Sequence, residues 1–446
     1  MSYLLHTDDE RRQMLAAIGV GKMSDLFTDI PMGIRSPALD IPGPLSETEI
    51  RNELNRLAAL NSGSSCSIFL GAGSYNHFSP AALPYIVKRS EFYTAYTPYQ
   101  PEISQGMLQA IFEYQTMMCE LTGLDASNAS MYDGATAMYE AAIMSMRATK
   151  MRMRVLIDEG VSPIYRRVLG SYAGNLDFDF VTVPHKNGRT DVEAIKAKLG
   201  PEIACVIVSN PNFFGIVQDF TALSEAVHAA GALLVMSVNP IAAAIVKSAA
   251  TMGADIALGE GQPLGSPMFF GGPYIGFLTV KEAFVRTMPG RIISETVDRD
   301  GKRGFVMTLQ TREQHIRREK ATSNICSNQG LIALTASVFL SLMGKRGLVE
   351  MAQQNVAKAE YAKGVLTALK GVALKFHEPT FNEFVITLPD RAEGTLKRLA
   401  VENKIIGGLA LGKYFTGMDR DVLVCVTEMN SKGAIDAYAA ALGRLL

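Results

Sequence analysis

The residues that could do chemistry gather in four short runs rich in glycine, proline, polar or aromatic side chains. The runs are Tyr-Asp-Gly-Ala-Thr at 132–136, Ser-Asn-Pro-Asn-Phe-Phe-Gly at 209–215, Gly-Glu-Gly-Gln-Pro-Leu-Gly at 259–265 followed by Phe-Phe-Gly-Gly-Pro at 269–273, and a tyrosine-rich run at 93–106. Open parallel sheets bind ligands beyond the carboxyl ends of their strands. Loops that follow apolar, strand-like segments are therefore the first places to search for a site.

The run at 132–136 opens a helical pattern. A helix start with glycine and threonine can bind a phosphate through its free backbone N–H groups and the helix dipole. Asp133, however, stands at the position of an N-cap, where its carboxylate would bond those N–H groups and repel a phosphate. We interpret the run as a plain N-cap, with phosphate binding as the alternative.

The two glycine-rich runs predict turns that follow strands. Asn210 and Pro211 favour a turn, and Gly215 permits a positive φ there. The stretch Gly259–Pro273 holds five glycines and three prolines in 15 residues, so its backbone can approach a ligand or another chain closely. A structural turn is the more common meaning of the 209–215 run, and a shaped loop without chemistry is an equally good interpretation of the 259–273 run.

The run at 93–106 places Tyr93, Tyr96 and Tyr99 within seven residues, beside two prolines. A phenol combines an apolar body with a polar tip, which suits interfaces and ligand pockets. We favour an interface or a pocket over a core-packed arm. A further polar segment, Arg-Glu-Lys-Ala-Thr-Ser-Asn-Ile-Cys-Ser-Asn-Gln at 318–329, precedes a long helix and could bind an anion or simply cap that helix.

The elements that must position these runs alternate between helix and strand from about residue 104. The patterns predict helices over 105–122, 135–149, 162–172, 192–199 and 221–230, and strands over 154–158, 178–183, 203–209, 232–238, 255–258 and 275–280. This alternation predicts an α/β domain with a mostly parallel, doubly wound sheet. We expect an N-terminal arm over 1–64, a large α/β domain over 65–327, and a small α+β domain over 328–446 that begins with a connecting helix.

Composition narrows the functional classes. The 446 residues carry 43 basic and 44 acidic side chains without a basic tract, so no nucleic-acid surface is expected. The five cysteines are scattered without CxxC spacing, which argues against a disulfide framework and a zinc cluster, and no metal site is expected. No signal-like or membrane-spanning segment is evident, so we expect a cytoplasmic protein. HExxH, Walker A, GxSxG and GxGxxG motifs are absent from the sequence.

Several of these runs resemble one family. Tyr-Thr-Pro-Tyr-Gln-Pro-Glu-Ile-Ser-Gln-Gly at 96–106 is similar to the signature of glycine dehydrogenase (decarboxylating), the P-protein of the glycine cleavage system. Asn-Ala-Ser-Met-Tyr-Asp-Gly-Ala-Thr at 128–136, Asn-Pro-Asn-Phe at 210–213 and Arg-Glu-Lys-Ala-Thr-Ser-Asn-Ile at 318–325 fit the same family. The resemblance runs over nearly the whole chain and is to the N-terminal half, called subunit 1 or alpha. It implies fold type I of the enzymes that depend on pyridoxal 5'-phosphate (PLP), the aspartate-aminotransferase type.

The sequence departs from this family where the cofactor should be anchored. Fold type I enzymes need a lysine, because an amine is required to form the Schiff base. The loop after 255–258 carries Gln262 instead, and no lysine occurs between Lys247 and Lys281. Ser237 stands where an acidic partner of the pyridine nitrogen is expected, and Asp133 occupies the phosphate position. Three losses together predict a relic site, with PLP bound by a partner beta subunit and not by this chain.

The resemblance implies that this chain is one subunit of a heteromeric glycine decarboxylase, and that the complex is a heterotetramer. The complex would decarboxylate glycine and pass the aminomethyl group to the lipoyl arm of the H-protein, alongside the T- and L-proteins. This chain would lend Tyr96, Tyr99 and Gln100 to the substrate side. Gly271, Gly272, Thr322, Ser323 and Asn324 would face the partner's cofactor. Two alternative functions remain for this chain. It could be a self-sufficient PLP enzyme, or a purely structural or regulatory partner of the beta subunit.

Overall fold

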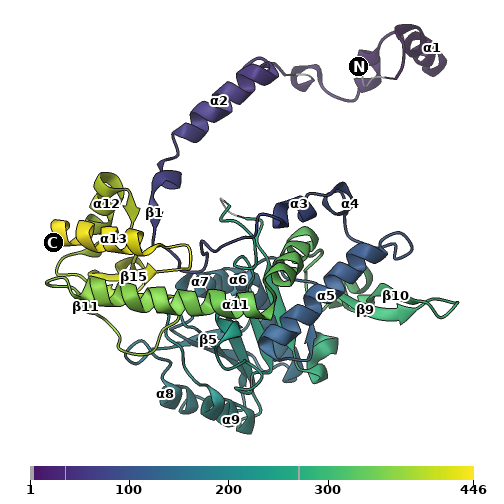
Figure 1. The fold of residues 1–446 in the computed structure, drawn as a ribbon. Helices are drawn as coiled ribbons and strands as arrows, with labels where there is room; N and C mark the ends of the chain where they lie inside the picture. Colours follow the sequence, from purple (N-terminus) through teal and green to yellow (C-terminus); the bar gives the residue numbers. More distant parts are fainter. Residues whose placement is uncertain (1–4, 36, 270–271) are drawn as a thin grey trace. The chain divides into compact units, whose positions relative to one another are not determined.

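The computed structural model describes residues 5–35, 37–269 and 272–446 (Figure 1). The chain divides into two compact units, Met1–Ser64 and Ser65–Leu446. The first unit holds α1 (Asp8–Ile18) and α2 (Glu47–Ala59), and neither helix has a buried residue. A capping box starts α2, since Ser46 and Glu49 bond each other's backbone N–H groups.

A seven-stranded sheet forms the centre of the second unit. Its strand order is β2-β8-β7-β6-β5-β3-β4. The bounds are β2 (Ala126–Ser127), β3 (Arg154–Asp158), β4 (Asp179–Val183), β5 (Ile203–Asn210), β6 (Leu233–Val238), β7 (Ile256–Glu260) and β8 (Gly276–Val280). The neighbours from β7 to β4 pair in parallel, whereas β8 runs antiparallel to both β7 and β2. The prediction of a mostly parallel sheet is confirmed.

Helices cover both faces of this sheet, which explains why its strands are almost continuously apolar. They are α5 (Gln105–Thr122), α6 (Gly134–Ala148), α7 (Pro163–Ala173), α8 (Val192–Lys196) and α9 (Thr221–Ala229). On β5, Cys205 and Ile207 pack with residues of α6, whereas Val206 and Val208 pack with residues of α9. In Figure 1, α8 and α9 lie below β5, and α6 and α7 lie above it.

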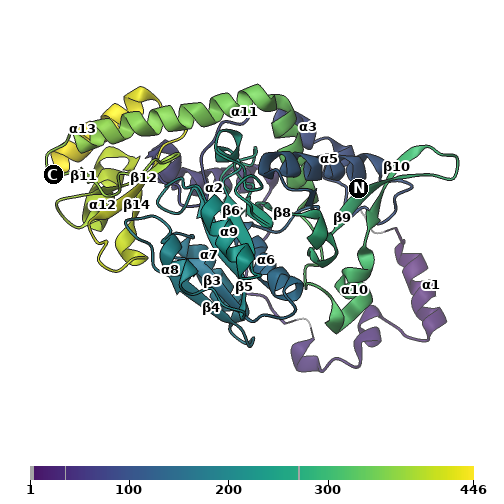
Figure 2. The same ribbon diagram turned by 90° about the horizontal axis from the view of Figure 1, so that it is seen from below.

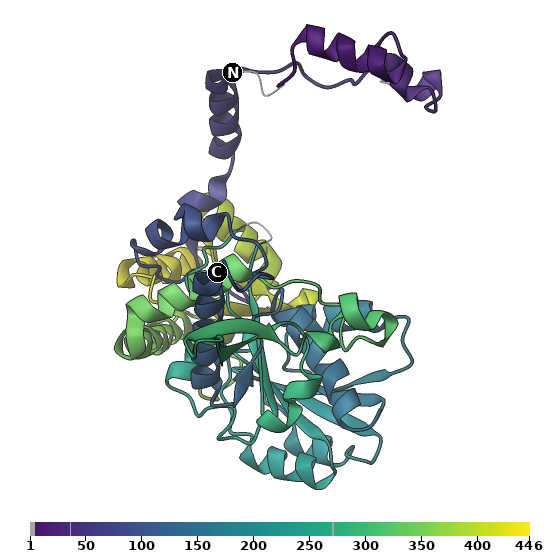
Figure 3. The ribbon, with the colours of Figure 1, turned by 90° about the vertical axis from the view of Figure 1, so that its right-hand side faces the viewer.

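A second, four-stranded sheet belongs to the C-terminal part of the chain, with strand order β11-β12-β15-β14. Its strands are β11 (Ala373–Leu374), β12 (Glu383–Thr387), β14 (Leu409–Ala410) and β15 (Asp421–Cys425), covered by α12 (Ala392–Asn403) and α13 (Lys432–Leu445). Figure 3 shows these yellow-green and yellow elements grouped beside the teal strands of the large sheet. Ser67–Ile68 (β1) pairs with Ile405–Ile406 (β13), so the chain just after residue 65 joins this part instead of the large sheet.

The long helix α11 (Gly330–Thr367) connects the two sheets, as Figure 2 shows. Its backbone leaves helical geometry at Gly344, where φ is 59°. The first half packs against α5 and the 264–277 region, and the second half packs against the four-stranded sheet. The helix is long and apolar enough by composition to cross a membrane, but these two clusters account for its apolar side.

Smaller elements complete the second unit. They are α3 (Leu83–Val87), α4 (Ser90–Tyr93), α10 (Gln314–Arg317) and an antiparallel hairpin of β9 (Ile292–Val297) and β10 (Arg303–Thr308). The sequence patterns above did not predict the hairpin. Its turn carries Asp300 and Gly301, a pair that favours hairpin turns, and Asp298 accepts hydrogen bonds from two N–H groups of that turn.

Candidate functional site

The pocket at the carboxyl ends of β5, β6 and β7 is small. Its volume is about 70 Å³, whereas pockets that bind small molecules and cofactors measure roughly 300–1,000 Å³. Ser209, Asn212, Ser237, Glu260 and Glu383 contribute its polar lining. This is the location at which the fold leads one to expect a cofactor.

The start of α6 is capped by two carboxylates. Asp133 accepts hydrogen bonds from the N–H groups of Ala135 and Thr136, both at 2.9 Å, so the predicted N-cap is present. Glu260 accepts the N–H of Gly134 at 3.1 Å. All three N–H groups that could hold a phosphate are therefore bonded, and a phosphate would face two acidic side chains.

Glu260 was not singled out from the sequence. It is the acidic side chain between Gly259 and Gly261, and it also accepts the N–H groups of Gln262 and Ile275 at 3.0 and 3.3 Å. Burial raises the pKa of this carboxyl to about 7, against the opposing effect of the three backbone N–H groups. An acidic residue directly after a strand, between two glycines, was the available signal.

Gln262 is 1% exposed and its amide is fully engaged. Its carbonyl oxygen accepts the N–H of Tyr75 at 2.9 Å, and its amide nitrogen donates to the carbonyls of Tyr75 at 2.9 Å and Ser266 at 2.8 Å. An amide cannot form a Schiff base, and this one joins the 72–75 segment to the glycine-rich loop. Ser237, on β6, lines the same pocket and brings no carboxylate.

The residues present therefore do not fit PLP. The lysine is replaced, the expected acidic partner is a serine, the phosphate position holds Asp133 and Glu260, and the space is too small. Glu383 and Tyr75 occupy the remaining wall, where the Tyr75 hydroxyl donates to the Glu383 carboxylate at 2.8 Å.

We expect Gln262→Lys to leave this chain unable to trap PLP. The single exchange restores an amine but leaves the two carboxylates and the small volume unchanged, and it removes three hydrogen bonds that hold the loop. The isolated variant and the wild-type chain should be incubated with PLP, reduced with borohydride and mapped by mass spectrometry. A stoichiometric pyridoxyl-lysine at position 262 would contradict the conclusion that this pocket does not fit PLP.

The aromatic loop lies on the surface. Tyr96 is 82% exposed, Tyr99 is half exposed, and Gln100 is exposed. Beneath the loop lies Arg291, whose guanidinium donates to the hydroxyls of Thr97 and Tyr99. Sequence reasoning did not find Arg291, which follows a Pro-Gly pair and carries no motif of its own.

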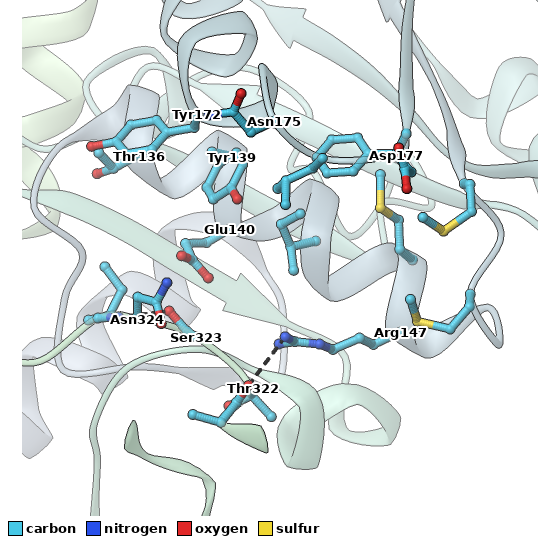
Figure 4. A pocket seen from close by; sticks show the side chains of 18 of the residues that line it. Thr136, Tyr139, Glu140, Arg147, Tyr172, Asn175, Asp177, Thr322, Ser323 and Asn324 are labelled. Carbon is cyan, nitrogen blue, oxygen red and sulfur yellow. Dashed lines mark hydrogen bonds between the residues drawn. The ribbon is translucent and has the colours of Figure 1, made fainter. Parts of the chain in front are cut away.

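The segment with Thr322, Ser323 and Asn324 forms one wall of a cavity of about 650 Å³ (Figure 4). Glu140 and Arg147 of α6 project into the same cavity, and Arg147 donates to the carbonyl of Ala321 at 3.3 Å. Burial raises the pKa of Glu140 to about 7, although a hydrogen bond with Ser323 opposes the shift. The opposite wall carries Tyr139, Tyr172, Asn175 and Asp177.

The structure brings some of the predicted residues close to one another and leaves others apart. A small cavity of about 80 Å³ lies between residues 95–98 of the aromatic loop and residues 327–331, which follow the 322–324 segment after a gap of two residues. Gly272, with φ of 102°, instead lies beside Tyr274, whose hydroxyl accepts a hydrogen bond from Ser74 at 3.1 Å. Gly271 lies outside the described residues. Within the described ranges, no group of three or more acidic, histidine or cysteine side chains could hold a metal ion.

Comparison with known proteins gives a consistent result over the full length. The model of the glycine cleavage system P-protein family matches residues 1–442. Proteins named "Probable glycine dehydrogenase (decarboxylating) subunit 1" from Desulfitobacterium hafniense and Moorella thermoacetica are 48% and 47% identical to this chain, each covering 100% of both sequences. A crystal structure of glycine decarboxylase (P-protein) in inhibitor-bound form is 44% identical over 100% of both chains, with a TM-score of 0.92.

More distant structures share only the fold. A glutamate decarboxylase from Lactobacillus brevis matches with a TM-score of 0.69 at 12% identity, covering 95% of this chain and 96% of its own. The predicted fold type I of PLP-dependent enzymes is confirmed, although the small pocket does not fit the cofactor. Because both the family model and the full-length relatives agree, the chain belongs to the P-protein family of the glycine cleavage system.

Proposed function

We propose that this chain is the subunit of a glycine decarboxylase that does not bind PLP and that completes the active site of a related, lysine-bearing subunit. The observation that carries the proposal is Gln262, a buried and fully bonded amide at the position where the family's chemistry requires a lysine. Full-length relatives named subunit 1 support the existence of such a partner.

The reaction of the complex balances without a further reagent. The bond between the carboxylate and the methylene carbon of glycine breaks, and CO2 leaves. The methylene carbon forms a bond to one sulfur of the lipoyl disulfide on the H-protein. The S–S bond breaks, and the second sulfur takes up a proton. Glycine is thus oxidised while the disulfide is reduced, and PLP on the partner subunit supplies the electron sink.

The contribution of this chain is to position groups and exclude water. Tyr96, Tyr99 and Gln100 are exposed hydrogen-bonding side chains on a loop held from beneath, which suits insertion into a neighbouring site. Ser323 and Asn324 lie on the segment that leads to residues 327–331, next to that loop. We assign these residues, with Thr322, Gly271 and Gly272, to the partner's substrate and cofactor phosphate.

Replacing Tyr99 by phenylalanine and Gln100 by alanine together tests this assignment. We expect the variant to assemble with the lysine-bearing subunit, and kcat/KM for glycine to fall about 100-fold, because hydrogen bonds to developing charge are worth that much in a closed site. The measurement is release of labelled CO2 from glycine in the presence of H-protein. A matched control, Tyr85→Phe with Gln354→Ala, exchanges the same residue types at exposed positions away from the loop and the cavity. A double variant that assembles and decarboxylates normally would refute the assignment.

A structural or regulatory role is the second candidate. It is favoured by the small size of the pocket, because a subunit that binds no cofactor could instead have the sole task of stabilising its partner. The two roles separate when the lysine-bearing subunit is assayed alone. Full turnover of glycine by that subunit would support the structural role, whereas activity that appears only on addition of this chain supports a shared site.

A further inference from the structure

We propose that Arg291 is a positioning residue, which fixes the Tyr99 hydroxyl as an outward hydrogen-bond donor to an anionic group of the partner's site. The inference rests on the proposed function. It assigns to the shared active site a residue, Arg291, that orients the Tyr99 side chain. The anionic group is a carboxylate or phosphate oxygen. Such an oxygen can accept the Tyr99 proton while the Tyr99 oxygen accepts from Arg291.

Arg291 lies beneath the aromatic loop in a fixed position. The residue is 3% exposed and directly precedes β9, and its carbonyl accepts the N–H of Ala129 at 2.7 Å. Its guanidinium donates to the Tyr99 hydroxyl and, at 3.4 Å, to the Thr97 hydroxyl. The guanidinium carbon lies 5.1 Å from the centre of the Tyr99 ring. The planar fork of arginine reaches two hydroxyls at once, which a lysine ammonium cannot do with the same geometry.

The charge of Arg291 is costly to bury, and its partners inside the fold are limited. The nearest carboxylate is Glu313, whose Oε2 lies 3.8 Å from Nε, beyond hydrogen-bonding distance. Nε is buried without a hydrogen-bond acceptor among the described residues. An apolar side chain would fill the same space without this cost. The guanidinium is therefore kept here by its buried ion pair with Glu313 together with the two loop hydroxyls, which accept its hydrogen bonds.

The direction of the Tyr99 proton follows from donor and acceptor chemistry. A guanidinium has five N–H donors and no acceptor, so the Tyr99 oxygen must accept from Arg291. The proton of Tyr99 cannot be used in that contact and is available to another acceptor. Because Tyr99 is half exposed, that acceptor lies outside this chain. An outward-facing phenol donor beside a buried positive charge suits an anionic oxygen.

A double-mutant cycle tests the proposal in the complex reconstituted with the lysine-bearing subunit and H-protein. We expect Arg291→Met and Tyr99→Phe each to lower kcat/KM for glycine about 10- to 100-fold, and the double variant to lose little more than either alone, because the two residues act as one unit. Arg303→Met is the matched control, since Arg303 lies 5.0 Å from the ring centre of Phe305 on the same hairpin but is exposed. It should leave kcat/KM unchanged.

The outcomes separate the two proposals. If Tyr99→Phe has no effect, the shared-site assignment fails and this inference fails with it. If Tyr99→Phe lowers activity but Arg291→Met does not, or if the two losses multiply, only the role of Arg291 is overturned. Should Arg291→Met fail to fold, Arg291→Lys takes its place in the same cycle, with an expected loss of about 5-fold that disappears in the Tyr99→Phe background.

Discussion

Gly215→Ala is expected to lower the free energy of unfolding by more than about 4 kcal/mol, because a methyl group cannot be accommodated and the backbone cannot yield. A Cβ at this position would lie 1.9 Å from the carbonyl oxygen of Glu383, and φ is 81°. The turn after β5 is also hydrogen-bonded to the segment that precedes β12, since the carbonyl of Gly215 accepts the N–H of Phe381 at 3.0 Å. Relief of the clash would require the turn after β5 to separate from β12.

The measurement is chemical denaturation of the purified chain, followed by circular dichroism. Gly170→Ala is the control, since its Cβ would meet nothing within 4 Å on an exposed face of α7. That exchange should stabilise the chain by about 0.5–1 kcal/mol, the difference in helix propensity between glycine and alanine. A Gly215→Ala variant within about 1 kcal/mol of the parent chain would contradict the contact between turn and strand.

The second large effect is a fall in stability as pH rises from about 5 to 8. Burial raises the pKa of Glu383, Glu260 and Glu140 to about 7, and that of Asp158 to about 6. When the pH is above the ordinary pKa of these carboxyls, the unfolded chain has released their protons while the folded chain still holds them. Protonation therefore favours the folded state at pH 5, and this contribution is lost as pH passes through 6 to 7.

Glu383→Gln isolates one of these groups. The glutamine can accept the N–H of Ala72 in place of the carboxylate, and the Tyr75 hydroxyl can accept from the new amide, so both contacts survive. At about 1.4 kcal/mol per pKa unit, a rise from 4.5 to about 7 corresponds to roughly 3 kcal/mol. We expect the variant to lose roughly 3 kcal/mol less than the parent chain between pH 5 and pH 8.

Denaturation midpoints at half-unit pH steps give the two curves directly. Glu53→Gln serves as the control, because the Glu53 carboxylate is exposed beside Arg56 and its pKa is lowered, so it does not titrate in this range. Parallel curves for Glu383→Gln and the parent chain would show that Glu383 is already ionised at pH 5.

The sequence by itself determined the features that depend on residues close together along the chain. Periodicity placed most helices and strands within a few residues of their observed bounds, because side-chain burial repeats locally along each element. The N-cap role of Asp133 followed in the same way, since a cap bonds N–H groups only two and three residues away. The family was evident from the run at 96–106, and full-length relatives confirm it.

Only the tertiary structure decided which distant residues meet. Glu260 bonds the start of α6 across 126 positions of the sequence, and Arg291 bonds Tyr99 across 192. Neither contact leaves a local pattern, because strand order and loop paths bring the partners together. The same holds for β1, which pairs beside the C-terminal sheet. The absence of a lysine at position 262 was visible in the sequence, but the small size of the pocket became evident only from the fold, which brings Glu260 and Tyr75 into its lining.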